Sequence, residues 1–183
     1  MERKAIFAGF GGQGILLMGT LLSHAAAAEG MEVVMTQSYG AEMRGGTSNC
    51  SVTISDEFIG SPIVEKAHGC VVMNLPSFRR FTSMVRTRGV LILNSSLIDK
   101  EPNSKSIRSF EVPATKIAER LGNRQVANLV ALGAFVETTK MVEAQSILKA
   151  LRKVLPMHRL HTLPLNELAF QEGREWAHRA KAS

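Results

Sequence analysis

The sequence begins with a short apolar run that ends in a glycine-rich turn, Gly9-Phe-Gly-Gly-Gln-Gly14. The run, residues 3–10, has the length and apolar character of a buried strand. The turn leads into residues 12–28, whose apolar positions fall on overlapping helical faces before Gly30. A second strand is expected at residues 33–38. Strand, glycine turn, helix and strand in under 40 residues predict a βαβ unit with parallel pairing and a right-handed crossover.

The rest of the chain alternates between apolar runs and helical patterns, so we expect one domain over residues 1–183. Residues 49–54 alternate polar and apolar, and Asp56-Glu57 predicts a turn into Phe58-Ile59, a hairpin that makes the sheet mixed. Further strands are expected at 70–75, 90–94 and 107–112, and helices at 77–85, 113–121, 125–139, 142–155 and 164–176. The expected fold class is α/β: a Rossmann-like three-layer α/β/α domain with a mostly parallel, mixed sheet.

The glycine turn matches the pattern G-x-G-x-x-G after a strand and at the start of a helix, where that pattern has a physical function. Backbone N–H groups and the positive end of the helix dipole favour a phosphate or a carboxylate there. A dinucleotide site also needs an acid at the end of the second strand, whereas that strand ends in Thr36-Gln37-Ser38. Contact with an anion or a cofactor edge, binding of NAD(P) or FAD, and simple close packing of strand and helix therefore all stay open.

A second candidate segment follows the second strand, where residues 38–48 contain Arg44, Gly45 and Gly46. In a parallel fold this loop leaves the same edge of the sheet as the glycine turn, and ligands bind at that edge. Arg44 is a bidentate donor for a carboxylate or a phosphate, and the two glycines let backbone amides face the same anion. A surface arginine in a loop, or one in a subunit contact, explains the segment equally well.

The sequence lacks the residue sets of several common catalytic sites. Cys50 and Cys70 are its two cysteines, too few for an iron–sulfur or structural zinc site, and they are expected as free thiols. No Ser-His-Asp or Cys-His pattern suggests a nucleophile, and His158 and His161 form H-x-x-H without a third ligand. The glycine turn is not followed by the Lys-Ser/Thr pair that holds β- and γ-phosphates. We therefore expect neither a catalytic residue nor a metal site.

The net charge of +6 favours acidic partners. The basic residues are scattered and no stacking aromatics accompany them, so an acidic protein or a phosphorylated cofactor is expected rather than nucleic acid. The apolar runs are too short or too interrupted to cross a bilayer, and the first one is too short for a secretory signal. The sequence thus predicts a soluble, cytoplasmic protein without a membrane partner.

Four segments together resemble the gamma subunits of 2-oxoacid:ferredoxin oxidoreductases. They are AGFGGQG at 8–14, SYGAEMRGGTSNC at 38–50, TISDEFIGSP at 53–62 and VANLVALGA at 126–134. The resemblance runs in order over nearly the whole chain, and the SYGAEMRGG segment is more similar to 2-oxoglutarate or branched-chain 2-oxoacid enzymes than to the pyruvate type. His68 is a departure, because the family often has Asp before the fourth strand.

The resemblance implies a subunit without an active site of its own, in a complex that converts a 2-oxoacid (2-oxoglutarate favoured) and coenzyme A to acyl-CoA and CO2 and reduces ferredoxin. It implies thiamine diphosphate, iron–sulfur clusters and coenzyme A in the complex, none bound by this chain alone, and alpha and beta partner subunits, with a delta subunit in some assemblies. The alternative is a free-standing Rossmann protein that binds NAD(P) or FAD. For contacts to a cofactor or partner, the resemblance favours Gly11, Gly12, Gln13, Gly14, Arg44, Gly45 and Gly46.

Overall fold

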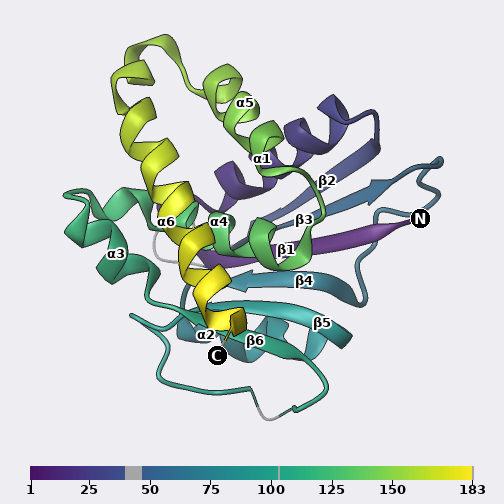
Figure 1. Ribbon diagram of the computed structural model, residues 1–183. Helices are drawn as coiled ribbons and strands as arrows, with labels where there is room; N and C mark the ends of the chain where they lie inside the picture. The colour runs from purple at the N-terminus through teal and green to yellow at the C-terminus, as the bar shows by residue number, and fades with distance from the viewer. Residues whose placement is uncertain (40–46, 103, 183) are drawn as a thin grey trace.

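The computed structural model of the protein describes residues 1–39, 47–102 and 104–182. Within these residues, six strands form one mixed sheet in the order β2-β3-β1-β4-β5-β6 (Figure 1). Strands β1, β4, β5 and β6 run parallel to one another, whereas β3 is antiparallel to both of its neighbours, β1 and β2. The strands are β1 (Arg3–Phe10), β2 (Glu32–Tyr39), β3 (Thr47–Ser55), β4 (Ala67–Val72), β5 (Val85–Asn94) and β6 (Arg108–Val112).

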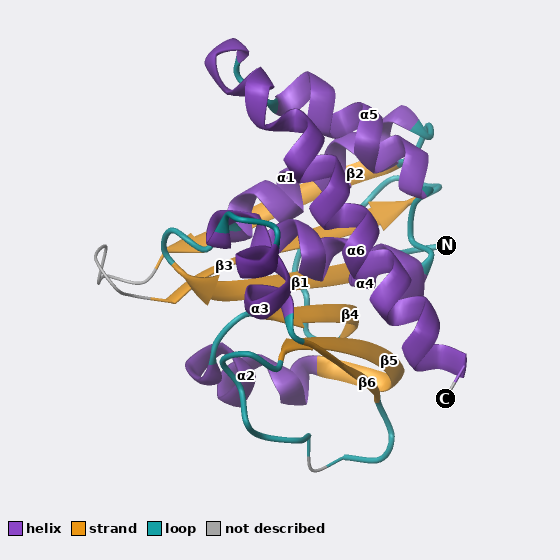
Figure 2. Ribbon diagram, turned by 60° about the vertical axis from the view of Figure 1, so that its left-hand side comes forward, coloured by secondary structure: helices purple, strands orange, loops and turns teal. Residues whose placement is uncertain are grey.

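Helices cover both faces of the sheet unequally, as Figure 2 shows. One face carries α1 (Ile15–Ala28), α3 (Ala114–Arg120), α4 (Ala127–Thr139), α5 (Ala144–Val154) and α6 (Leu163–Ala182). The other face carries α2 (Leu75–Phe81) with the short turn η1 (Thr82–Met84). Two further short turns, η2 (Arg124–Val126) and η3 (Met157–Thr162), precede α4 and α6. The predicted α/β fold class with three layers and a mixed sheet is therefore confirmed.

Strand β1 shows why the core has two parts. Successive side chains of a strand point to opposite faces of its sheet. Ala5 and Phe7 accordingly belong to the large apolar cluster beneath α1, α4 and α6, and Ile6 and Ala8 belong to the smaller cluster beneath α2. Such a continuous apolar run is typical of a strand that is buried on both faces. No helix among the described residues is both long and apolar enough to cross a lipid bilayer.

The expected pairing of the first two strands is wrong. Strands β1 and β2 point the same way, but β3 lies between them and pairs with both. The register places Val52 opposite Ala5 on one side and opposite Met35 on the other. Local sequence patterns predict that a strand forms but not which strand it pairs with. They therefore could not predict that the antiparallel strand β3 lies between β1 and β2.

The expected hairpin at Asp56-Glu57 is also wrong. Strand β3 forms its hairpin with β2, across residues 40–46, and Phe58-Ile59 is not a strand. The turn itself exists, because the backbone N–H of Glu57 donates to the Ser55 hydroxyl at 3.1 Å. After it the chain leaves the sheet, with Phe58 exposed and Ile59 buried. The strands expected at 70–75 and 90–94 and the helix expected between them form a second βαβ unit, since β4 and β5 pair in parallel and α2 connects them.

His68 lies inside β4, half-buried, and its ring is held by the neighbouring strand. Its Nδ1 atom accepts the backbone N–H of Lys4 at 3.1 Å. Burial, together with the positive charges of Arg86 and Arg3 nearby, holds the pKa of the His68 imidazole below its ordinary value. The imidazole is therefore the neutral partner of a strand hydrogen bond.

This arrangement predicts a loss of stability in mild acid. Below the ordinary histidine pKa the unfolded chain binds a proton that native His68 does not, so the free energy of unfolding falls as the pH drops toward the native pKa. His68→Asn keeps a hydrogen-bond acceptor and cannot titrate, so it should flatten this part of the profile in urea titrations between about pH 5 and pH 8. His24→Asn removes an exposed imidazole from α1 and serves as the matched control. If the free energy of unfolding changed with pH equally in wild type and in His68→Asn, the neutral, buried state assigned to His68 would be refuted.

Candidate functional site

The glycine turn lies at the carboxyl end of β1, and its glycines are required by the backbone. Gly12 and Gly14 have positive φ angles of 89° and 70°, which side chains disfavour. The N–H of Gln13 closes the turn by donating to the carbonyl of Phe10 at 3.1 Å. Among the described residues, a Cβ atom added at Gly11 or Gly12 would meet no other atom within 4 Å. The outer side of the turn therefore faces open space, with room for a ligand or for another protein surface.

The side chain of Gln13 ties this turn to the end of β4. Its Oε1 accepts the backbone N–H of Phe10 at 2.7 Å and the Nδ2 group of Asn74 at 3.3 Å. Its Nε2 group donates to the carbonyl of Met73 at 3.5 Å. Asn74 in turn accepts the N–H of Ser77 and caps α2. Gln13 thus acts mainly as a brace between two strand ends, and the exposed surface of the turn is left to its glycines.

Gln13→Ala should therefore lower stability. It removes the acceptor for the Phe10 N–H and the link to Asn74, so we expect a loss of about 2 kcal/mol in the free energy of unfolding. Gln145→Ala, at an exposed position of α5, should change stability by less than about 0.5 kcal/mol. Chemical denaturation of both variants measures this, and equal stabilities would argue against the brace.

Asn128 fixes the junction between the turn and α1. Its Nδ2 group donates to the carbonyl of Gly14 at 3.2 Å, and a Cβ atom at Gly14 would collide with the Asn128 amide. Gly14 is the N-cap residue of α1, and within the described residues no side chain caps this helix. The positive end of the helix dipole therefore stays at the turn, where it favours an anion.

A cleft of about 250 Å³ opens beside the turn, at the edge formed by the carboxyl ends of β1, β4 and β5. Its cation is Arg124, a largely exposed side chain whose Nε atom lies 3.8 Å from Glu119. Among the described residues, its lining includes no carboxylate, imidazole or thiol, so these residues offer binding groups rather than a general acid or a general base. The lining residues are Gly12, Gln13, Met73, Leu97, Thr115, Arg124, Gln125 and Ala127.

The segment with Arg44, Gly45 and Gly46 lies outside the described residues. The residues that flank it are placed, and they lie at the edge where the sequence predicts it. Thr47 pairs with Phe10, the last residue of β1, and Tyr39 pairs with Ser48. The end of the segment at Thr47 is thus attached next to the glycine turn, and the end at Tyr39 lies one strand further away.

The arrangement is unfavourable for an ordinary dinucleotide site. In such sites an acid at the end of the second strand holds the ribose hydroxyls, and that strand lies beside the first. Here β3 separates β2 from β1, which moves the end of β2 away by one strand spacing, about 4.8 Å. The acid of β2, Glu32, stands at its other end, opposite Ser55.

The remaining titratable candidates do not form a reactive centre. Cys50 and Cys70 are free thiols, buried on opposite faces of the sheet. Burial raises the pKa of Cys50 to about 12 and that of Cys70 well above its ordinary value, so neither is a nucleophile at neutral pH. His158 and His161 lie exposed in η3. Among the described residues, no group of three His, Cys, Asp or Glu side chains could hold a metal ion.

The glycine turn follows the first strand as the sequence predicts, but the sequence does not predict the residues that support it, Asn74 and Asn128, or the cleft cation Arg124. Asn128 lies 114 positions from Gly14, and Asn74 lies 61 positions from Gln13. Contacts at such separations follow from the fold and not from local spacing. One signal was available, because Asn128 belongs to the segment 126–134 that resembles the gamma subunits.

Comparison with known proteins supports the resemblance to gamma subunits over nearly the whole chain. The family model for pyruvate ferredoxin/flavodoxin oxidoreductase matches residues 4–176. The 2-oxoglutarate synthase subunit KorC of Methanocaldococcus jannaschii is 38% identical over 97% of this chain and 95% of its own length. KorC of Methanothermobacter marburgensis is 36% identical over 96% of both chains. The keto/oxoacid ferredoxin oxidoreductase gamma subunit of Geobacter sulfurreducens has a similar structure, with a TM-score of 0.84, 31% identity and coverage of 97% and 99% of the two chains.

Proposed function

This chain belongs to the pyruvate ferredoxin/flavodoxin oxidoreductase family, and from that premise we propose that it is the gamma subunit of a 2-oxoglutarate:ferredoxin oxidoreductase. The observation that carries the proposal is its likeness, along nearly the full length of both chains, to 2-oxoglutarate synthase subunits at 36–38% identity. The proposed complex converts a 2-oxoacid, with 2-oxoglutarate favoured, and coenzyme A to acyl-CoA and CO2, and passes the electrons to ferredoxin.

In this proposal the redox and carbanion chemistry belongs to partner subunits. An iron–sulfur cluster does not fit the described residues, because Cys50 and Cys70 are buried on opposite sides of the sheet and no further cysteine exists. The described lining of the 250 Å³ cleft likewise offers no acid or base for thiamine chemistry. Thiamine diphosphate, the iron–sulfur clusters and the substrates are therefore assigned to the assembled enzyme, in which alpha and beta subunits, and a delta subunit where present, are the partners.

The role proposed for this chain is contact at the edge that carries the glycine turn. Of the predicted contact residues, Gly11 and Gly12 present an open backbone surface at the positive end of α1, and Gln13 and Gly14 hold that turn in place. Arg44, Gly45 and Gly46 belong to a segment attached at the same edge. These groups suit an anionic edge, either of coenzyme A or of a partner subunit. Arg124, across the cleft, adds a third positive element.

A native pull-down tests the assignment of partners. Purification of the tagged chain from its own cells should recover alpha and beta subunits, identified by mass spectrometry, together with thiamine diphosphate and iron in the recovered complex. The two free thiols suit a reducing cytoplasm, so the complex is expected in the cytoplasmic fraction. Recovery of the chain alone under gentle conditions would overturn the proposal.

Calorimetry tests the competing function, a free-standing NAD(P)- or FAD-binding protein. The isolated chain should bind none of these dinucleotides tightly, because β3 separates the end of β2 from the turn. Micromolar or tighter binding of NAD(H), NADP(H) or FAD by the chain alone would favour the competing function.

A further inference from the structure

A second candidate binding surface lies beside α2 and the start of β5. Two clefts of about 550 and 540 Å³ adjoin between α2–η1 and the connection from β5 to β6, and they share Thr82, Ser83 and Ser104. They therefore form one groove, which we call the basic groove. Its lining residues are Lys66, Leu75, Phe78, Arg79, Thr82, Ser83, Val85, Arg86, Thr87, Lys100, Glu101, Pro102, Ser104, Ser106 and Ile107.

We propose that the basic groove is the docking site for an acidic protein segment. The proposal goes beyond the function assigned above and does not rest on it. It rests on three observations: the charge of the groove, the way its cations are held, and a strained arginine at its rim.

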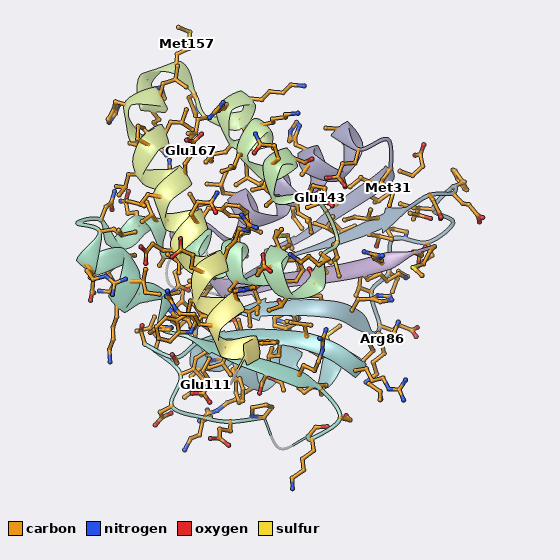
Figure 3. The ribbon with its side chains drawn as sticks, in the orientation of Figure 1. Met31, Arg86, Glu111, Glu143, Met157 and Glu167 are labelled. Carbon is orange, nitrogen blue, oxygen red and sulfur yellow. The ribbon has the colours of Figure 1, made fainter. Side chains whose placement is uncertain are left out.

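The charge of the protein is concentrated around this groove. Residues 63–110 contain eight Lys or Arg and three Asp or Glu, so this stretch carries most of the chain's net charge of +6. Its cations are scattered along the sequence, and the fold brings them together from the approach to β4, from α2, from the start of β5 and from the β5–β6 connection. Figure 3 shows Arg86 projecting outward from the amino end of β5. A local excess of this kind steers and holds acidic surfaces.

Two cations of the groove are held by backbone carbonyls, and none of the four is neutralised by an acid among the described residues. The Nζ group of Lys66 donates to the carbonyl of Ser83 at 2.8 Å, and the Nε group of Arg86 donates to the carbonyl of Thr87 at 3.4 Å. Within the described part of the chain, none of Lys66, Arg79, Arg86 and Lys100 forms an ion pair with an acid. Their charge is therefore available to a partner, beside the hydroxyls of Ser83, Ser104 and Ser106.

Arg88, next to the groove, is held in a backbone conformation that favours glycine. Its φ angle is +62°, and its N–H donates to the carbonyl of Ser106 at 2.7 Å, which ties the start of β5 to the far wall of the groove. A left-handed conformation costs a non-glycine residue roughly 1–2 kcal/mol. Strain of this kind is found where the surrounding structure fixes a residue for binding. Here it fixes the backbone of β5 against Ser106, which lines the groove.

The shape of the groove favours a protein segment over other anions. Two adjoining clefts that are bordered by separate cations suit a row of carboxylates along an extended chain better than a single phosphate. Binding of single-stranded nucleic acid uses exposed aromatic side chains, on which the bases stack. The aromatic residue of the lining, Phe78, is buried and belongs to the core beneath α2. The lining thus offers four cations, one carboxylate (Glu101) and several hydroxyls without a stacking platform.

The test uses the full chain and a fluorescein-labelled peptide of about ten glutamates as the probe. Fluorescence anisotropy measures its Kd for wild type, for a groove triple variant and for a control triple variant. The groove variant is Arg79→Ala/Arg86→Ala/Lys100→Ala. The control, Lys149→Ala/Lys153→Ala/Arg159→Ala, removes the same charge from exposed positions of α5 and η3. Thermal unfolding checks that both variants are folded.

We expect the groove variant to raise the Kd of the peptide about tenfold and the control variant to raise it less than about twofold. Equal weakening in the two variants would overturn the proposal, because net charge alone would then explain binding. Wild type that does not bind the peptide at millimolar concentration would overturn it too. A thymidine oligonucleotide that binds more tightly than the peptide would make the groove a nucleic-acid site, and displacement of the peptide by micromolar pyrophosphate would make it a phosphate site.

Discussion

Gly173→Ala is expected to destabilise the domain by about 3 kcal/mol, because α6 and α4 touch backbone to backbone. A Cβ atom at Gly173 would collide with the carbonyl of Val130 in α4. In the opposite direction, a Cβ atom at Gly133 would collide with the carbonyl of Phe170 in α6. A flexible side chain could move aside, but two packed helix backbones cannot without separating the helices. The helix propensity of alanine offsets at most about 1 kcal/mol of this cost.

Urea unfolding of Gly173→Ala and Gly133→Ala measures the effect. The free energy of unfolding of both variants should be lower than that of wild type. Gly60→Ala is the matched control, since a Cβ atom there meets nothing within 4 Å and the residue is exposed. It should change stability by less than about 0.5 kcal/mol. If Gly173→Ala remained within about 1 kcal/mol of wild type, the close crossing of α4 and α6 would be wrong.

Gly11→Asp is expected to separate folding from function. A Cβ atom at Gly11 would meet no atom of the described residues within 4 Å, so the fold should be unchanged. The new carboxylate would stand at the positive end of α1, where we place the anionic edge of coenzyme A or of a partner subunit. Like charges at a contact cost several kcal/mol, so activity of the assembled enzyme should fall about 100-fold.

Gly60→Asp is the control for this variant, because it adds the same charge at another open glycine. Gly60 follows β3, whose last residues pair with the amino end of β1. The glycine turn lies at the carboxyl end of β1, so the two positions are at opposite ends of that strand. Gly60→Asp should leave turnover and assembly unchanged. Wild-type turnover in Gly11→Asp would remove the glycine turn from the contact surface.

The sequence predicted the elements of this fold better than their pairing. Residues 3–10 form β1 as expected, because a strand buried on both faces is a continuous apolar run. The helix after the turn starts later than expected, at Ile15, since Gly12 and Gly14 adopt positive φ angles that belong to the turn. The partner of β3 was misassigned, because residues 40–46 and Asp56-Glu57 both contain turn-forming residues and local sequence does not choose between them.

The candidate site was predictable only in part for the same reason. The glycine turn is a local feature, because the residues that adopt positive φ angles, Gly12 and Gly14, lie close together in the sequence. Its supports are not local: Asn74 and Asn128 reach Gln13 and Gly14 from elements that are distant in the sequence. The basic groove was missed because its cations are distributed over residues 66–100 and gather only when α2 packs against β4 and β5.

Reconstitution tests most directly the central claim, that this chain is a necessary subunit without an active site of its own. Purified alpha and beta subunits should be assayed for 2-oxoglutarate- and coenzyme A-dependent reduction of ferredoxin, first without this chain and then with wild type, Gly60→Asp or Gly11→Asp. The chain alone should show no turnover, and wild type and Gly60→Asp should restore an activity that Gly11→Asp does not. Full turnover by the partner subunits in the absence of this chain would contradict the account.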